Sequence, residues 1–135
     1  MDERRAVERA SGVRAPFWLA AADGRLAIQR CQTCRSYHHP PVDICPECLS
    51  VDLVFEDVSG EGSVAAFTIT GDPASVGVEP FVVAVVYLDE DPALRLLTNL
   101  PGVRLACVRP GLRVRLARPS AAAPFVPQFT SIDDC

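Results

Sequence analysis

The chain has 135 residues, of which 49% are hydrophobic and 22% are charged, so it has the composition of a packed domain and not of a disordered segment. Its formal net charge is −4, and all 13 basic residues are arginine. This acidic balance argues against a protein that binds nucleic acid by neutralising phosphates. The longest apolar run, residues 81–88, is too short to span a bilayer.

No apolar segment follows the charged residues 2–5, so we expect no signal peptide, no membrane association and a cytoplasmic location. In that compartment, cysteines are usually metal ligands or free thiols, and disulfides are rare. We therefore expect the six cysteines of this chain to be ligands and free thiols.

The N-terminal part is predicted to be helical. Residues 4–10 form only a weak, charged helical stretch. Residues 16–24 are a better helix, because Pro16 suits the first turn and Gly24 suits the left-handed position after the last one. We expect Trp18 to pack on the strand that follows this helix.

Strand patterns dominate the rest of the chain. A first strand, residues 26–30, leads into a cysteine-rich segment. Five later apolar segments are each bounded by turn residues, and they span residues 53–57, 63–70, 81–88, 94–100 and 112–117. Residues 81–88 place apolar side chains on both faces of the predicted strand, which indicates a central strand of the sheet. Five strands with uneven connections are typical of a small Greek-key barrel of the OB type.

The C-terminal residues are predicted to form an extended tail. Prolines at 119, 124 and 127 deny it the hydrogen bonds of a strand. A solvated tail has little use for Phe125 and Phe129, so we predict that both contact a partner protein. Deletion of residues 120–135 is then expected to leave the fold intact and to abolish the complex.

Four cysteines have the spacing C-x2-C-x10-C-x2-C. Two such turns meet as a tetrahedral site with four sulfur ligands, and soft thiolates in that geometry favour zinc. Because four protein ligands leave no position for water, the zinc is predicted to be structural. An iron centre of the rubredoxin type uses the same ligands, and the spacing alone does not exclude it. The predicted ligands are Cys31, Cys34, Cys45 and Cys48.

Two histidines, His38 and His39, lie between the two cysteine pairs. Since four cysteines already complete the site, we interpret both as ordinary residues of a connecting strand. Cys107 has apolar neighbours and is predicted to be buried and inert, and Cys135 a bystander. The sequence has no G-x-S-x-G, H-E-x-x-H or P-loop motif, so we expect no catalytic role for the chain.

Five of the 13 arginines fall within fifteen residues near the C-terminal end of the strand-rich part. The simpler interpretation is the solvated face of the last barrel strand. The functional interpretation is a surface that contacts CoA phosphates or an acidic partner. These residues are Arg104, Arg109, Arg113, Arg115 and Arg118.

Several short motifs follow one another in a specific order over residues 16–130. They are Pro16-Phe17-Trp18, Gly24-Arg25-Leu26, the first cysteine pair, His39-Pro40-Pro41, Cys45-Pro46-Glu47-Cys48, Ser59-Gly60-Glu61-Gly62-Ser63-Val64, Phe67-Thr68, the run 81–88, Gly111 and Val114. Together they resemble the DUF35 family. The chain departs from that family at Arg35, since many members have glycine after the second cysteine.

The resemblance implies a mainly β protein with a short N-terminal helix, a rubredoxin-like zinc ribbon and a C-terminal five-stranded OB-fold barrel. We place the helical segment at residues 1–25, the zinc ribbon at 26–52, the OB-fold at 53–119 and the tail at 120–135. Family members are typically non-catalytic partners of thiolase-like enzymes or hydratases that act on acyl-CoA thioesters.

The favoured hypothesis is therefore an accessory subunit that docks on a thiolase-like, lipid-transfer-protein-like enzyme in a hetero-oligomer, with acyl-CoA near the interface. The favoured reaction is retro-aldol cleavage in sterol side-chain degradation, by family analogy. Two alternatives remain open, a nucleic-acid-binding zinc ribbon/OB module and a rubredoxin-type electron carrier.

Overall fold

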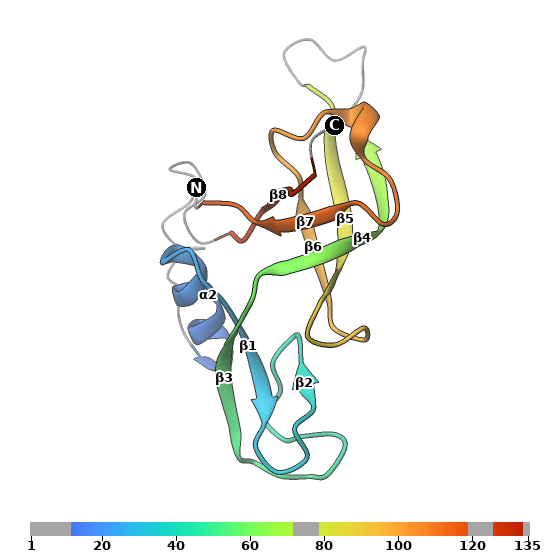
Figure 1. Cartoon of the computed structure of the whole chain (residues 1–135). Helices are drawn as coiled ribbons and strands as arrows, with labels where there is room; N and C mark the ends of the chain where they lie inside the picture. The colour runs from blue at the N-terminus through green and yellow to red at the C-terminus, as the bar shows by residue number, and fades with distance from the viewer. Residues whose placement is uncertain (1–11, 72–78, 119–125, 134–135) are drawn as a thin grey trace. The chain divides into compact units, whose positions relative to one another are not determined.

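The computed structural model describes residues 12–71, 79–118 and 126–133. The chain divides into two compact units, one within residues 1–59 and 118–127 and the other within residues 60–117 and 128–135. Each unit is built on one antiparallel sheet (Figure 1). No helix among the described residues is long and apolar enough to cross a membrane.

The first unit begins with a short 3-10 turn, η1 (Gly12–Arg14), and the helix α2 (Ala15–Ala22). Pro16 lies in the first turn of α2, as predicted. The helix ends in a Schellman arrangement, in which Arg25 donates to the carbonyl of Ala20 at 2.9 Å and Gly24 to that of Ala21 at 3.1 Å. Gly24 has φ 75°, which confirms its predicted left-handed role.

The sheet of the first unit has the order β2-β1-β3, with β1 at Leu26–Cys31, β2 at Tyr37–His38 and β3 at Leu53–Val58. We expected β3 to be the first barrel strand, but in the structure it belongs to the sheet of the first unit. It pairs with β1 along its whole length, from Leu26↔Val58 to Cys31↔Leu53. The chain returns from the cysteine segment along the open edge of β1, a pairing between distant residues that a local pattern does not reveal.

Buried Gln29 on β1 fixes the loop between the two cysteine pairs. Its side-chain nitrogen Nε2 donates to the carbonyl of Val42 at 2.9 Å, and its Oε1 accepts from the N–H of Val42 at 2.8 Å. The Gln29 side-chain amide thus makes the two hydrogen bonds that the backbone of a neighbouring strand would make. Because only 3% of Gln29 is exposed, these bonds replace the ones that water would otherwise supply.

The second unit is a five-stranded sheet of order β6-β5-β4-β7-β8. Its central strand β4 (Glu61–Thr70) pairs with β5 (Phe81–Leu88) and with β7 (Arg113–Leu116), and a bulge between Val64 and Ala66 bends it. β6 (Arg95–Asn99) pairs with β5, which lies between two strands as predicted. A 3-10 turn, η2 (Leu105–Cys107), precedes β7.

The strand β8 (Phe129–Ser131) corrects our prediction of an extended tail. It pairs with β7 through Leu116↔Phe129 and Val114↔Ser131, and Phe129 is 0% exposed. Phe129 is therefore a core residue of the chain and not a partner contact. The prolines precede this strand and leave its N–H groups free to pair, and three residues are too few to produce a strand pattern. Phe125 lies outside the described residues.

Candidate metal centre

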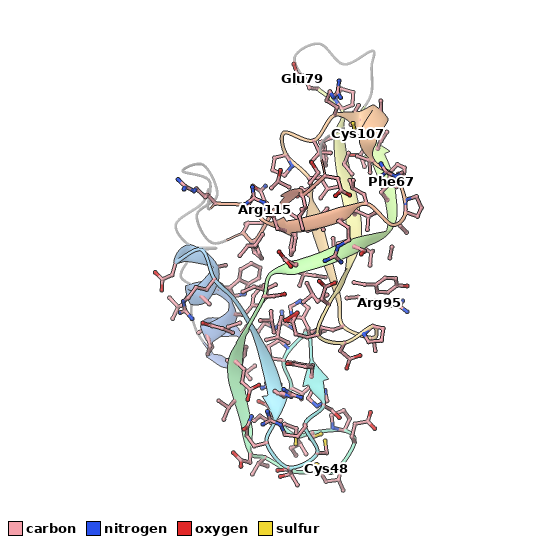
Figure 2. All side chains as sticks on the ribbon, in the orientation of Figure 1. Cys48, Phe67, Glu79, Arg95, Cys107 and Arg115 are labelled. Atoms are coloured by element: carbon pink, nitrogen blue, oxygen red, sulfur yellow. The ribbon has the colours of Figure 1, made fainter. Side chains whose placement is uncertain are left out.

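The four predicted ligands come together at the end of β1 and in the loop before β3. Their sulfur atoms all lie within 4.8 Å of one another, with Cys31 3.5 Å from Cys48 and Cys34 3.6 Å from Cys45. A tetrahedral zinc with bonds of about 2.3 Å holds its sulfurs about 3.8 Å apart, so the donor set fits this metal. Cys31 and Cys45 are buried, whereas Cys34 and Cys48 are exposed (Figure 2 labels Cys48).

The two cysteine turns repeat one backbone pattern. In each, the residue after the second cysteine donates its N–H to the carbonyl of the first cysteine, at 2.9 Å from Arg35 and 2.8 Å from Leu49. The first cysteine of each turn donates its own N–H to the serine five residues later, at 2.9 Å in both. Arg35 and Leu49 have φ values of 66° and 65°, the left-handed region that favours glycine.

This conformation explains the glycine that many DUF35 members have where this chain has Arg35. The strained arginine is held by its neighbours: Arg30 Nε donates to the Arg35 carbonyl at 2.8 Å, and Arg35 Nη1 donates to Gln32 Oε1 at 2.9 Å. Arg35 Nη2 also lies 3.4 Å from Glu56 Oε1. The departure from the family pattern therefore leaves the turn and its ligands in place.

The pKa values of Cys31, Cys34 and Cys48 indicate that a cation stabilises the cluster. A hydrogen bond from the backbone N–H of Cys34 lowers the pKa of Cys31 to about 6, and a hydrogen bond with the Ser36 side chain lowers the pKa of Cys34. At Cys48 the N–H of Ser50 favours the thiolate, but partial desolvation of the sulfur and the other three cysteines together raise the pKa to about 12. Four adjacent thiolates repel one another, and a divalent metal ion removes that repulsion by replacing the protons.

The two histidines have different surroundings. Nε2 of His38, on β2, lies 3.3 Å from the sulfur of Cys45, so His38 contacts a ligand and is more than the ordinary strand residue we expected. The ring of His39 packs at 4.8 Å against Phe17. Burial, and then the positive charge of Arg14, lower the pKa of His39.

The predicted arginine cluster does not form one free surface. Arg113 is held by two bonds to the carboxylate of Asp89, at 2.7 and 2.6 Å, and donates to Ser63 Oγ at 3.0 Å. It is therefore already paired within the chain. Four of the five, Arg104, Arg109, Arg115 and Arg118, are exposed (Figure 2 labels Arg115).

Cys107 is 4% exposed, which confirms that it is buried. It is disulfide-bonded, so the expectation of a free thiol at this position was wrong.

An open cavity of about 730 Å³ lies in the second unit, at the ends of β5 and β6. Among the described residues that line it, the ionisable ones are Glu79 and Arg104, which do not form a nucleophile–base pair.

Fold and site together define a zinc-ribbon and OB-fold protein. A family model described as "ChsH2, rubredoxin-like zinc ribbon domain" matches residues 18–54, and one described as "ChsH2, C-terminal OB-fold domain" matches residues 55–118. The chain belongs to this ChsH2-type DUF35 family, and its four cysteines hold one structural zinc. The boundary between the two family models falls inside β3, whereas the two compact units divide after Ser59.

Two solved structures are similar to the chain. The "Ltp2-ChsH2(DUF35) aldolase" is 34% identical, with a TM-score of 0.79 over 91% of this chain and 97% of that one. A DUF35 protein of unknown function from Sulfolobus solfataricus is 17% identical, with a TM-score of 0.67 over 96% of this chain and 92% of that one, and shows the fold alone.

A curated relative is the "Probable enoyl-CoA hydratase alpha subunit" of Thermomonospora curvata. It is 42% identical over 86 residues, which cover 62% of this chain and 26% of that protein. The chain thus spans about a quarter of the length of this relative. The aldolase and the hydratase subunit are both named as parts of enzyme complexes.

Proposed function

We propose that this chain is a non-catalytic, zinc-containing subunit that docks on a thiolase-like, lipid-transfer-protein-like enzyme acting on acyl-CoA thioesters. The favoured reaction of the complex is retro-aldol cleavage of a steroid side chain. The observation that carries the proposal is the similarity to the Ltp2-ChsH2(DUF35) aldolase over 91% of the chain at 34% identity.

The chemistry of the chain supports a non-catalytic role. Four cysteine ligands close the coordination shell of the zinc, so it has no open position for water or substrate. When bound, the metal would cross-link the two cysteine turns of the ribbon. The chain's own residues prepare the site: backbone N–H groups stabilise the thiolates, and Gln29 holds the loop between the two cysteine pairs.

An enoyl-CoA hydratase is the second candidate partner. The 42% identity to the hydratase alpha subunit favours it, since that protein contains a segment similar to 62% of this chain. Both candidates act on thioesters of CoA, and they differ in the reaction that the partner performs.

Contact with CoA remains a prediction for the exposed arginines of the cluster, Arg104, Arg109 and Arg115. We assign no phosphate contact to Arg113, because its guanidinium already binds Asp89. Phe125 likewise remains a predicted partner contact.

The test is co-expression with the thiolase-like enzyme of the same host. We expect a hetero-oligomer that elutes as one species on gel filtration, and retro-aldol activity on a steroid acyl-CoA that requires both chains. Equal activity of the partner enzyme alone would contradict the proposal. A complex with the host's enoyl-CoA hydratase instead would select the second candidate.

The open alternatives have their own measurements. DNA binding at physiological salt is expected to be no tighter than about 10⁻⁴ M, the non-specific range, and nanomolar binding would select the nucleic-acid module. The purified protein is expected to be colourless, and a red protein with iron charge-transfer bands would select the electron carrier.

A further inference from the structure

The second cysteine turn carries three exposed apolar side chains, which we call the ribbon tip. Ile44, Leu49 and Val51 are 53%, 76% and 75% exposed. The N–H of Cys45 donates to the carbonyl of Ser50 at 2.9 Å, which brings the segments containing Ile44 and Val51 next to each other. Cys48, in the same turn, lies at the end of the ribbon away from α2 (Figure 2).

Leu49 is unfavourable for the isolated chain in two ways. Its φ of 65° places a residue with a Cβ in the left-handed region, where glycine or asparagine is far more common. Its side chain is also 76% exposed, so its apolar surface gains little from packing within the chain.

Arg35 provides an internal comparison, because it occupies the equivalent position of the first turn with a φ of 66°. Its side chain has partners in the chain, Gln32 at 2.9 Å and Glu56 at 3.4 Å, which offset the backbone strain. The exposed side chain of Leu49 makes no polar contact that could offset its backbone strain. The exposed side chain of Leu49 is therefore available for a contact with another protein.

The charge around the ribbon tip indicates the chemistry of that contact. Three exposed carboxylates, those of Asp43, Glu47 and Asp52, border the tip in sequence, and none forms an ion pair with another described residue. The four thiolates outweigh the charge of the zinc, so the metal centre is also negative. This field repels phosphates, including those of CoA and nucleic acid, and attracts arginine and lysine.

We infer that the ribbon tip is a docking surface for a protein whose own surface has an apolar centre bordered by basic residues. The choice of partner rests on the proposed function and is the thiolase-like aldolase. An apolar centre with a charged border is the common arrangement of a protein interface, and Leu49 is its central anchor.

The experiment measures the affinity of the host's thiolase-like aldolase for zinc-loaded variants of the full chain. Leu49→Gly is expected to weaken binding at least about tenfold, while its zinc content is unchanged and its melting temperature is not lowered. The matched control is Leu97→Ser, because Leu97 on β6 is 72% exposed and lies outside the tip; we expect its affinity to equal that of the wild type. Glu47→Arg is expected to slow association, most strongly at low salt.

The outcomes separate the inference from the proposed function. If the wild type binds the aldolase and Leu49→Gly binds equally well, the ribbon tip is not the interface, but the proposed function stands. If the wild type does not bind the aldolase, the proposed function and this choice of partner both fail. If the wild type sediments as a homodimer that Leu49→Gly dissociates, the tip binds a second copy of the chain and the inference is wrong.

Discussion

Arg35 and Leu49 have the same unusual backbone conformation, but their side chains have different surroundings. Both residues follow the second cysteine of a turn, and both have a positive φ. The arginine is bonded to Gln32 and Glu56, whereas the leucine is 76% exposed. The backbone strain at each position affects the free energy of unfolding, whereas an external role of the side chain affects binding, so the two can be measured separately.

Leu49→Gly is expected to raise the free energy of unfolding of the zinc-loaded protein by about 1 kcal/mol, because it removes the left-handed strain of a residue with a Cβ. Urea denaturation of the isolated chain measures this. Leu49→Ala keeps the strain and is the control, for which we expect no gain. A Leu49→Gly protein less stable than the alanine variant would show that the leucine packs within the chain.

The ion pair of Asp89 and Arg113 gives a pH-dependent contribution. The two bonds from Arg113 lower the pKa of Asp89 from its ordinary value of 3.8, so the folded state favours the carboxylate. The stabilisation is complete above that ordinary value and is lost as the pH falls through the lowered pKa. Because the side chains are 41% and 37% exposed, solvent limits the contribution to about 1 kcal/mol or less.

Asp89→Asn is therefore expected to destabilise the protein by that amount at pH 7 and by progressively less below about pH 4. Urea denaturation of both proteins as a function of pH measures the difference. A difference that persists unchanged at pH 2 would mean that the asparagine disturbs something other than the ion pair.

At the scale of elements, the pairing of β4 with β5 depends on a close approach at Gly62. A Cβ at this position would overlap the carbonyl oxygen of Tyr87 and lie 2.9 Å from Val86 Cγ1. The Tyr87 oxygen belongs to the backbone of β5 and the Val86 side chain is fully buried, so a side chain at position 62 would force the two strands apart. This accounts for one glycine of the motif that resembles DUF35.

Gly62→Ala is expected to lower the free energy of unfolding by about 3 kcal/mol, the upper part of the range for overpacking. Gly102→Ala is the matched control, because nothing lies within 4 Å of its Cβ and only its φ of +77° opposes the change; we expect a loss of about 1 kcal/mol there. Thermal melts of both variants provide the comparison. Equal losses at the two positions would argue against the close approach.

The strand β8 changes the expected effect of a C-terminal deletion. Removing residues 128–135 takes away β8, one of the two strands paired with β7, and the fully buried Phe129, whose loss alone costs about 3–5 kcal/mol. We now expect the deletion to unfold the second unit, contrary to our prediction of an intact fold. Loss of the thermal transition would support this, and an unchanged transition would restore the extended tail.

At the scale of the whole molecule, each compact unit has its own sheet, and only the first contains the metal site. Structural zinc contributes roughly 10 kcal/mol or more to the folding of such a site. Losing the metal therefore removes the stability of the ribbon, while the ladder between β4 and β5 loses none of its own bonds.

Purified protein is expected to contain about one zinc per chain, and Cys31→Ser or removal of zinc by a chelator is expected to unfold the ribbon alone. Hydrogen exchange measures this, with amides of β1 and β3 losing protection and those of β4 and β5 retaining it. Simultaneous loss of protection in both sheets would show that the two units unfold as one.

The sequence by itself determined the features that depend on neighbouring residues. The four ligands follow from two C-x2-C turns, whose backbone geometry spans six residues each. The end of α2 follows from Gly24, and the central position of β5 from apolar residues on both of its faces. In each case, the residues that form the interaction are close together in the chain, so their spacing carries the information.

Only the tertiary structure decided which distant segments pair. It placed β3 beside β1 in the ribbon, gave β7 the short strand β8, and joined Arg113 to Asp89. It also revealed that Leu49 is exposed at a strained backbone position. Such pairings depend on the packing of whole sheets, in which many weak contacts between distant residues compete, and no local pattern reports the outcome of that competition.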